Sequence, residues 1–274
     1  RNKVYIHGGY EHFVVSDPKR RDIHKTGVRD RLLHHAVYRI LYPYYDTHFI
    51  SDSYSCRNDK GTHKAIDRFA TFTRKVSRNH TRTCYVLKCD IRKFFASIDH
   101  KVLFKILERE ITSSDINDLL KKVVQSFHTT QLGKGLPLGN LTSQLFVNIY
   151  MNEFDQFVKH KLKTQFYIRY ADDFVILSRE KTELTKTLSY MIVFLRERLA
   201  LKLHPNKVSI VTIASGVDFL GWVQFTDHKV LRSVTKKRLI KKLQNPELSD
   251  ARTQSYLGLL KHGNTNRLRR SLNR

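Results

Sequence analysis

Two adjacent carboxylates, Asp172 and Asp173, stand inside a largely apolar stretch that covers residues 166–177. Aromatic and β-branched residues flank the pair on both sides, which is typical of two short strands joined by a tight turn. Solvation at the tip of a hairpin would explain two carboxylates in a turn. Because the stretch contains no glycine and its flanks are bulky and apolar, a divalent cation that neutralises two crowded charges is an equally good interpretation.

A third carboxylate, Asp90, stands near the C-terminal end of residues 84–91, an alternating segment that predicts another strand. Taken alone, Asp90 is better explained as the cap of a turn or helix. One carboxylate from a strand and two from a neighbouring hairpin are, however, the ligands that a two-magnesium phosphoryl-transfer site needs. Such ions bind oxygen atoms and clamp both the attacking and the leaving oxygen.

The overall charge predicts a polyanionic partner. Fifty Lys and Arg residues stand against twenty-five Asp and Glu residues, which gives a formal net charge of +25. A folded protein this basic repels itself, so nucleic acid is the expected partner. An anionic membrane surface is the weaker alternative, because the basic residues form no single amphipathic stripe and no apolar run is long enough to span a membrane.

The cysteines predict a cytoplasmic protein. Their number is odd, and their spacing is not that of zinc ligands, so we expect reduced thiols and no zinc site. The three residues are Cys56, Cys84 and Cys89. No secretory signal is visible in the sequence.

The periodicity of apolar residues predicts an α+β fold, with helices packed on one face of a mainly antiparallel sheet. Helices are predicted over residues 30–41, 99–111, 114–127 and 183–199, with Pro43 ending the first and Asp99 capping the second. A further long helix is predicted from apolar residues at spacings of three and four between Leu145 and Leu162. The turn-rich residues 133–140 lead into this helix. Strands are predicted over residues 208–213 and 217–225, and the chain turns basic and helical from Lys229.

Five motifs stand in the order of the palm motifs of reverse transcriptases and, with the segment before them, cover the chain from about Asp17 to Trp222. They are Asp90 followed by Phe94-Phe95, residues 136–144 (Leu-Pro-Leu-Gly-Asn-Leu-Thr-Ser-Gln), Tyr170-Ala171-Asp172-Asp173, Lys207, and Phe219-Leu220-Gly221-Trp222. On these motifs the chain resembles the reverse transcriptase family. The resemblance implies an RNA-directed DNA polymerase with a right-hand fold, whose palm is an antiparallel sheet covered by helices. It further implies fingers at residues 1–83, a palm at 84–225 with an insertion near the fingers at about 112–140, and a short helical thumb at 226–274.

Two positions indicate a narrower group. Most relatives carry glutamine before the glycine of the second motif and proline after its serine, whereas Leu138 and Gln144 stand here. This variant resembles the reverse transcriptases of diversity-generating retroelements, as do the segments at residues 53–57, 60–63 and 256–262. Reverse transcriptases of group II introns, retrons and phage defence are the alternatives. A different class of function is an RNA-binding scaffold that keeps the fold without the activity.

The resemblance assigns the chemistry to four residues. Asp90 and Asp172 are expected to bridge two Mg²⁺ ions, for which Mn²⁺ can substitute, with help from Asp173 and the main chain of Ile91. Lys207 is expected to protonate the departing pyrophosphate, although an ordinary surface lysine explains it nearly as well. These assignments predict a catalytic set of Asp90, Asp172, Asp173 and Lys207.

Binding residues are expected around this set. The incoming nucleotide is assigned to Lys25, Arg31, Phe95, Leu138 and Gly139. Arg31 is the strongest of the basic candidates, and Lys25 and Arg29 are weaker ones. Phe95 would exclude a ribose 2′-hydroxyl on steric grounds, or simply pack beside Phe94. Leu138 replaces an amide that contacts the nucleotide in relatives, so we expect relaxed base selection and errors at template adenines.

The primer and template are assigned to a second set, namely Tyr170, Asn140, Gln144, Gly221, Trp222, Lys236 and Lys237. Trp222 is explained equally well as a core aromatic. The basic C-terminal segment, which continues to Arg267, Arg269 and Arg270, is expected to bind duplex phosphates. The expected partners are an RNA template, a DNA or RNA primer and dNTPs, and the resemblance adds a small basic oligomeric accessory protein.

Overall fold

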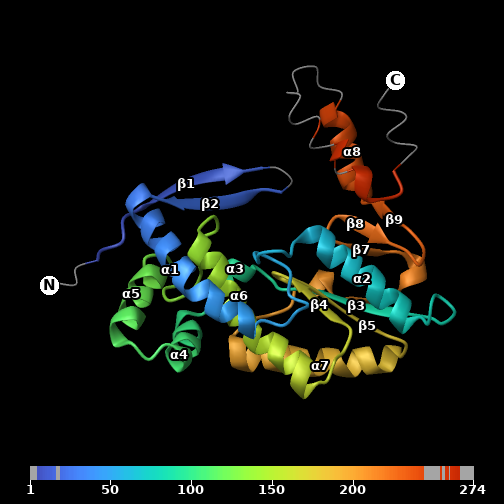
Figure 1. The fold of residues 1–274 in the computed structure, drawn as a ribbon, viewed down its shortest axis with the longest axis horizontal. Helices are drawn as coiled ribbons and strands as arrows, with labels where there is room; N and C mark the ends of the chain where they lie inside the picture. Colours follow the sequence, from blue (N-terminus) through green and yellow to red (C-terminus); the bar gives the residue numbers. More distant parts are fainter. Residues whose placement is uncertain (1–4, 17–18, 244–253, 255–256, 259, 266–274) are drawn as a thin grey trace.

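A four-stranded antiparallel sheet forms the centre of the computed structural model (Figure 1). The structure describes residues 5–16, 19–243, 254, 257–258 and 260–265. The strands lie in the order β4-β5-β3-β6. Their bounds are Tyr85–Asp90 for β3, Tyr167–Tyr170 for β4, Asp173–Ser178 for β5 and Ser209–Thr212 for β6. The predicted strands on both sides of the Asp172-Asp173 pair are therefore confirmed, as is the strand that ends at Asp90.

Both faces of this sheet are apolar, so helices cover both faces, and the prediction of a single covered face is wrong. Strand residues alternate between two clusters, because successive side chains of a strand point to opposite sides. Val86 and Val175 pack with α2 (Thr62–Val76), whereas Leu87 and Ile176 belong to the cluster that contains α6 and α7. Figure 1 shows α2 above the sheet and α7 below it.

The helices on the α7 side of the sheet are mostly those predicted from periodicity. They are α1 (Val28–His48), α3 (Phe94–Ser97), α4 (His100–Glu110), α5 (Ser114–Gln125), α6 (Leu141–Gln156), which continues as a π-helix at Phe157–Lys161, and α7 (Lys181–Leu199). The predicted cap of α4 is confirmed, since the Asp99 carboxylate accepts from the amides of Lys101 and Val102 at 3.0 and 3.2 Å.

Pro43 does not end α1, contrary to the prediction. The helix continues to His48, with the proline inside it. A proline in a helix interior costs about 3 kcal/mol through the lost hydrogen bond and the ring clash. Tyr45 and Phe49 lie beyond the proline and are buried in the main core, and burying one large apolar side chain contributes about 1.5–3 kcal/mol. Tertiary packing therefore outweighs the local cost of the proline.

Two smaller β elements flank the centre. One is the hairpin of β1 (Tyr10–Val15) and β2 (Arg21–Thr26), which extends over the molecule from the start of α1 (Figure 1). The other is a three-stranded sheet of β7 (Val217–Phe219), β8 (Trp222–Gln224) and β9 (Lys229–Leu231), followed by α8 (Ser233–Leu243). The single strand predicted over residues 217–225 is thus two strands, and a third strand precedes the predicted basic helix.

Leu220 and Gly221 cause that division. Both residues have positive φ, 51° and 85°, which two-residue hairpin loops of type I′ require. Single-turn helices complete the described chain at Pro205–Lys207, Ile213–Ser215 and Leu260–His262. Part of the motif at residues 256–262 lies outside the described residues, as do Arg267, Arg269 and Arg270.

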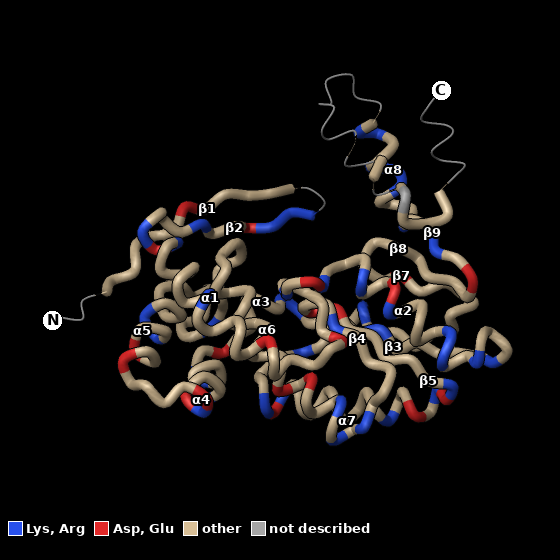
Figure 2. The backbone as a smooth tube through the Cα atoms, viewed as in Figure 1, with Lys and Arg blue, Asp and Glu red and all other residues tan. Residues whose placement is uncertain are grey.

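Basic residues are distributed over the whole chain, as expected from the sequence. Figure 2 shows Lys and Arg on the end of β2, along α7 and on α8, with Asp and Glu scattered among them. A search of the described helices finds none with the length and apolar character needed to span a bilayer.

Candidate active site

The turn between β4 and β5 presents Asp172 at the end of the central sheet. Tyr170 and Asp173 are directly opposite each other in the antiparallel register, and Ala171 takes a left-handed φ of 54°. This conformation costs about 1–2 kcal/mol in a residue with a side chain. Two carbonyls of the turn accept hydrogen bonds from residues outside it. Ile91 N–H donates to the Asp172 carbonyl, and Arg169 Nη1 donates to the Ala171 carbonyl, both at 3.2 Å.

Asp90 lies beside this turn because β3 pairs with β5. Its Cα is opposite that of Asp173 in the register. The Asp90 carbonyl accepts from His204 N–H at 2.7 Å, and its carboxylate accepts from Lys207 Nζ at 2.8 Å. The structure therefore brings together all four residues predicted to be catalytic.

The local electrostatics favour a cation at this turn. Burial raises the pKa of the Asp173 carboxyl to about 6; Lys88 opposes this shift, and the charges of Asp172 and Asp90 add to it. Burial also raises the pKa of Asp172, and the charge of Asp90 raises it further. Carboxylates with raised pKa values carry negative charge that their surroundings compensate incompletely, which is typical of functional sites.

The donor atoms fit magnesium in kind. Asp90 and Asp172 supply carboxylate oxygens, and Ile91 adds a main-chain carbonyl, all hard oxygen ligands of the type that Mg²⁺ prefers. Within the part of the chain that the structure describes, however, no three His, Cys, Asp or Glu side chains are arranged to hold an ion together. Lys207 instead neutralises Asp90. The assignment of Asp90 and Asp172 as metal ligands, with help from Asp173 and the main chain of Ile91, therefore stays a prediction.

A basic residue missed from the sequence, Lys19, acts on this site from the tip of the β1–β2 hairpin. Its charge lowers the pKa of Asp172, as does that of Lys207. The predicted residues Lys25 and Arg31 lie nearer the base of the hairpin. Lys25 pairs with Glu11 at 3.4 Å, and Arg31 is exposed on the first turn of α1. The side chain of Arg29 donates to Asp30 and to the Ile6 carbonyl.

The segment Leu138-Gly139-Asn140 holds the base of the hairpin. The Leu138 carbonyl accepts from His24 N–H at 3.0 Å. Gly139 has a φ of 108°, and a Cβ at this position would lie 2.8 Å from the Ile23 side chain. Asn140 is buried; its Nδ2 donates to the His24 carbonyl at 2.7 Å and its Oδ1 accepts from Thr26 Oγ1 at 3.2 Å. These bonds hold the start of α6 to β2, and the predicted contact of Asn140 with primer or template stays a prediction.

The remaining predicted residues lie at different depths. Phe95 is half-buried and meets Phe94 edge to face, with 5.7 Å between the ring centroids. Trp222 is only 2% exposed and packs with Ile66, Leu231, Leu239 and Leu260, so its interpretation as a core aromatic is confirmed. The others are Tyr170, whose hydroxyl accepts from Thr62, Gln144 on the first turn of α6, Gly221 in the β7–β8 turn, and the exposed Lys236 and Lys237 on α8.

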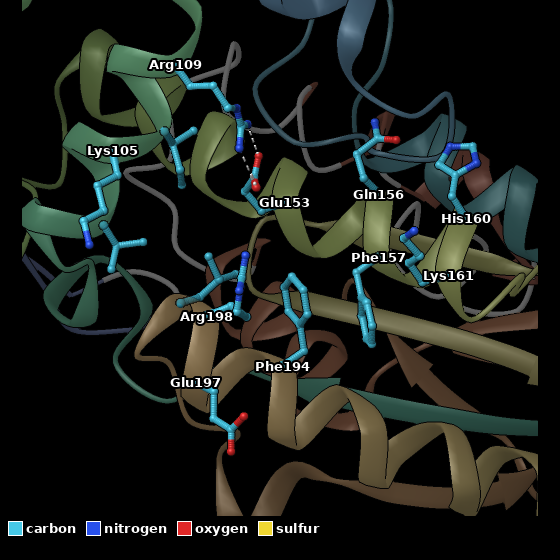
Figure 3. Close-up of a pocket in the computed structure, with 13 residues that line it drawn as sticks. Lys105, Arg109, Glu153, Gln156, Phe157, His160, Lys161, Phe194, Glu197 and Arg198 are labelled. Atoms are coloured by element: carbon cyan, nitrogen blue, oxygen red, sulfur yellow. Dashed lines mark hydrogen bonds and ion pairs between the residues drawn. The ribbon is translucent and has the colours of Figure 1, made fainter.

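A separate cavity of about 940 Å³ opens between α4, α6, the π-helix and α7 (Figure 3). Phe157 and Phe194 stack in it with ring centroids 4.2 Å apart, and Arg109 pairs with Glu153 at 2.5 Å. None of the residues predicted to bind metal, nucleotide or primer lines this cavity. Its position therefore does not bear on the chemistry at the turn.

Residues 17–224 match the family described as reverse transcriptase (RNA-dependent DNA polymerase). The chain belongs to the reverse transcriptase family. This match confirms the RNA-directed DNA polymerase domain predicted from the motif order. It does not distinguish the diversity-generating subtype from the other members of the family.

Three curated proteins illustrate the relationship of this reverse transcriptase to known ones. The chain is 25% identical to Protein YkfC of Escherichia coli over 79% of its length, and 23% identical to the group II intron-encoded protein LtrA of Lactococcus lactis over 76%. It is 28% identical to the retron Ec83 reverse transcriptase of E. coli over 66%. The matched region spans 65%, 44% and 62% of these relatives, respectively.

Solved telomerase structures share the fold. Apo telomerase from Candida tropicalis superposes with a TM-score of 0.64 at 11% identity, covering 87% of this chain and 50% of that one. Telomerase from Candida albicans, solved with a fragment of telomeric RNA, gives 0.60 at 12% identity and covers 89% and 50%. The right-hand polymerase fold predicted from the sequence is therefore confirmed.

Proposed function

We propose that this reverse transcriptase copies RNA into DNA, with Asp90 and Asp172 as the ligands of its catalytic metal ions. The observation that carries the proposal is the carboxylate pair at the β3–β5 edge, in a chain whose family is established by 208 of its residues (17–224). Bound Mg²⁺ would lower the pKa of the primer 3′-hydroxyl and stabilise charge on the phosphoryl oxygens. Mn²⁺ is expected to substitute.

The chain's own groups then have separate roles. Asp90, Asp172 and the Ile91 carbonyl would hold the ions, and Asp173 would add negative charge close by. Lys207, whose Nζ donates to Asp90, would give a proton to the departing pyrophosphate. Lys19, whose charge reaches Asp172 from the hairpin tip, would neutralise part of the charge of a triphosphate bound there. Phe95 limits the space for a ribose 2′-hydroxyl.

This proposal divides the chain into fingers (residues 1–83), palm (84–225, with the 112–140 insertion) and thumb (226–274). Lys236 and Lys237 on α8 would hold the phosphates of a template–primer duplex, which contacts proteins mainly through its backbone and shape. The charge of +25 supports a structured RNA partner. A small basic accessory protein and a cytoplasmic location belong to the same proposal.

We further propose that the enzyme serves a diversity-generating retroelement and makes errors at template adenines. Leu138 supports this, because an apolar side chain cannot donate or accept a hydrogen bond at the position where relatives carry an amide. The likeness to the group II intron and retron proteins favours the alternative that the enzyme serves one of those elements with the same chemistry.

Primer extension on an RNA template tests the polymerase proposal. Wild-type protein should extend a labelled DNA primer with dNTPs and Mg²⁺, and Asp172→Ala should lower the rate by at least about a thousandfold, the magnitude expected when a group central to transition-state stabilisation is removed. Template–primer affinity, measured by anisotropy without Mg²⁺, should not change. Asp227→Ala, an exposed aspartate between β8 and β9, is the matched control. Binding without extension by the wild-type protein would favour the scaffold function instead.

A further inference from the structure

A fully buried ion pair lies directly beneath the β4–β5 turn at Ala171 and Asp172, here named the catalytic turn. Arg169 on β4 and Asp155 on α6 are both 0% exposed. Arg169 Nη2 and Nε donate to the Asp155 carboxylate at 2.7 and 2.8 Å, and Tyr167 Oη donates to the same carboxylate at 2.7 Å. Arg169 shares its face of β4 with Tyr167, so both side chains of this face direct polar hydrogens to Asp155.

The guanidinium of Arg169 uses all of its donors. Besides Asp155, Nη1 donates to Asn148 Oδ1 and to the Ala171 carbonyl, both at 3.2 Å, and Nη2 donates to Ser53 Oγ at 3.1 Å. A guanidinium has five N–H groups in one plane, and here each has an acceptor. Arg169 therefore joins α6, the loop at Ser53 and the catalytic turn through one rigid group.

The main chain of Arg169 is held in the same way. Its N–H donates to the Asp52 carbonyl and its carbonyl accepts from Tyr54 N–H, both at 3.0 Å. Strand β4 is thus fixed on its outer edge, where a strand would otherwise be free to shift. Asp155 and Asn148, both buried on α6, set the position of the side chain from below.

Stability alone does not explain the pair. Removing two charges from water costs about as much as their attraction returns, so apolar residues of similar volume stabilise a core equally well or better. What the ion pair provides is direction, since a planar guanidinium held by a carboxylate places its remaining N–H groups at fixed points. One of those points is the carbonyl of Ala171, the strained residue next to Asp172.

We propose that Arg169, oriented by Asp155, is a positioning residue that holds the left-handed turn at Ala171 and so fixes the metal-binding oxygens of Asp172. This inference rests on the proposed polymerase function. It predicts that loosening the guanidinium alters metal binding more than it alters folding or template binding. Neither residue would touch substrate.

The decisive variant is Arg169→Lys, which keeps a charge for Asp155 but cannot also supply the fixed N–H groups that reach Ala171 and Asn148. We expect at least a tenfold loss of kcat in primer extension and a severalfold rise in the Mg²⁺ concentration for half-maximal rate. Mn²⁺ affinity, measured by electron paramagnetic resonance without nucleotide, should fall to the same extent. Template–primer affinity should stay within twofold of wild type.

Arg57→Lys is the matched control. Arg57 is also a buried arginine, it pairs with Asp46 at 2.7 Å, and it donates to the carbonyls of Ile50 and Ser53, but it makes no contact with the turn. This variant should lose thermal stability without any change in Mn²⁺ affinity. If Arg169→Lys behaves in the same way, the pair is structural only and the proposal is overturned.

Two further outcomes remain distinguishable. Should Arg169→Lys fail to fold, Tyr167→Phe removes one hydroxyl from Asp155, and a smaller loss of Mn²⁺ affinity is expected; no loss overturns the proposal. A wild-type protein that binds Mn²⁺ and template but never extends a primer contradicts the polymerase function. In that case the Mn²⁺ comparison of Arg169→Lys with Arg57→Lys still tests the positioning role by itself.

Discussion

Asn140→Ala should separate the hairpin from the catalytic turn without removing any group that contacts substrate. The side chain joins the start of α6 to β2 through two hydrogen bonds, a part-buried one to the His24 carbonyl and a buried one from Thr26 Oγ1. The hairpin carries Lys19, whose charge reaches Asp172. A loosened hairpin should therefore weaken triphosphate binding and leave the chemical step nearly intact.

The magnitude follows from these two bonds. A buried polar group that loses its partner costs about 1–3 kcal/mol, and both the His24 carbonyl and the Thr26 hydroxyl lose theirs. The bond from His24 N–H to the Leu138 carbonyl remains and retains part of the attachment. A cost of about 1–2 kcal/mol would lower the fraction of molecules that have the hairpin correctly placed. The KM for dNTPs would then rise about five- to thirtyfold.

Steady-state primer extension with varied dNTP concentration measures this directly. We expect the higher KM together with a kcat within about threefold of wild type, the pattern of lost binding that is common to ground and transition states. Asn117→Ala is the control, because that side chain, on the first turn of α5, donates its one hydrogen bond to the Ile111 carbonyl at the end of α4. An unchanged dNTP KM with weaker template–primer binding would refute this reasoning, since it would mean that Asn140 contacts nucleic acid itself.

Three further predictions concern base selection, sugar selection and pH. Leu138→Gln should lower misincorporation over template adenines, as read by sequencing of cDNA; an unchanged error spectrum would contradict the role of Leu138. Phe95→Val should raise the kcat/KM for ribonucleotides relative to deoxynucleotides by about tenfold, and equal ratios in both proteins would leave Phe95 only a packing role. Burial lowers the pKa of His34 to about 4, from 6.5 in the unfolded chain. Between these two pH values only the unfolded chain binds a proton at this residue, so the free energy of unfolding rises with pH across this window. Urea unfolding at pH 5 should give a free energy about 1–2 kcal/mol below that at pH 7, and His34→Gln should reduce this difference.

The catalytic turn could be predicted from the sequence because its signals are local. Two runs of apolar residues fix β4 and β5, and the alternation before Asp90 fixes β3. Antiparallel pairing then leaves few ways to arrange three short strands, so the two carboxylate positions meet at one edge. Helix caps such as Asp99 are local in the same sense.

Long-range contacts explain what could not be predicted. Pro43 ends a helix by local rules, but the buried aromatic residues beyond it continue α1. Lys19 is one basic residue among fifty Lys and Arg, and only the course of the hairpin brings it to Asp172. Lys88 carried a usable signal, because it stands two residues before Asp90 and must share its face of β3.

Arg169 and Asn140 show a further reason, since Asn140 belongs to a motif that suggests substrate contact and Arg169 directly precedes another. Each stands beside a residue that faces the site, yet each is buried and directs its polar atoms into the protein. A polymerase must hold the turn at Asp172 and the β1–β2 hairpin at fixed positions. Buried hydrogen bonds fix the orientation of a group more tightly than apolar packing does, because they are directional. Motif order therefore identifies the reaction, whereas the burial of each motif residue decides whether it acts on the substrate or on the backbone that presents the catalytic groups.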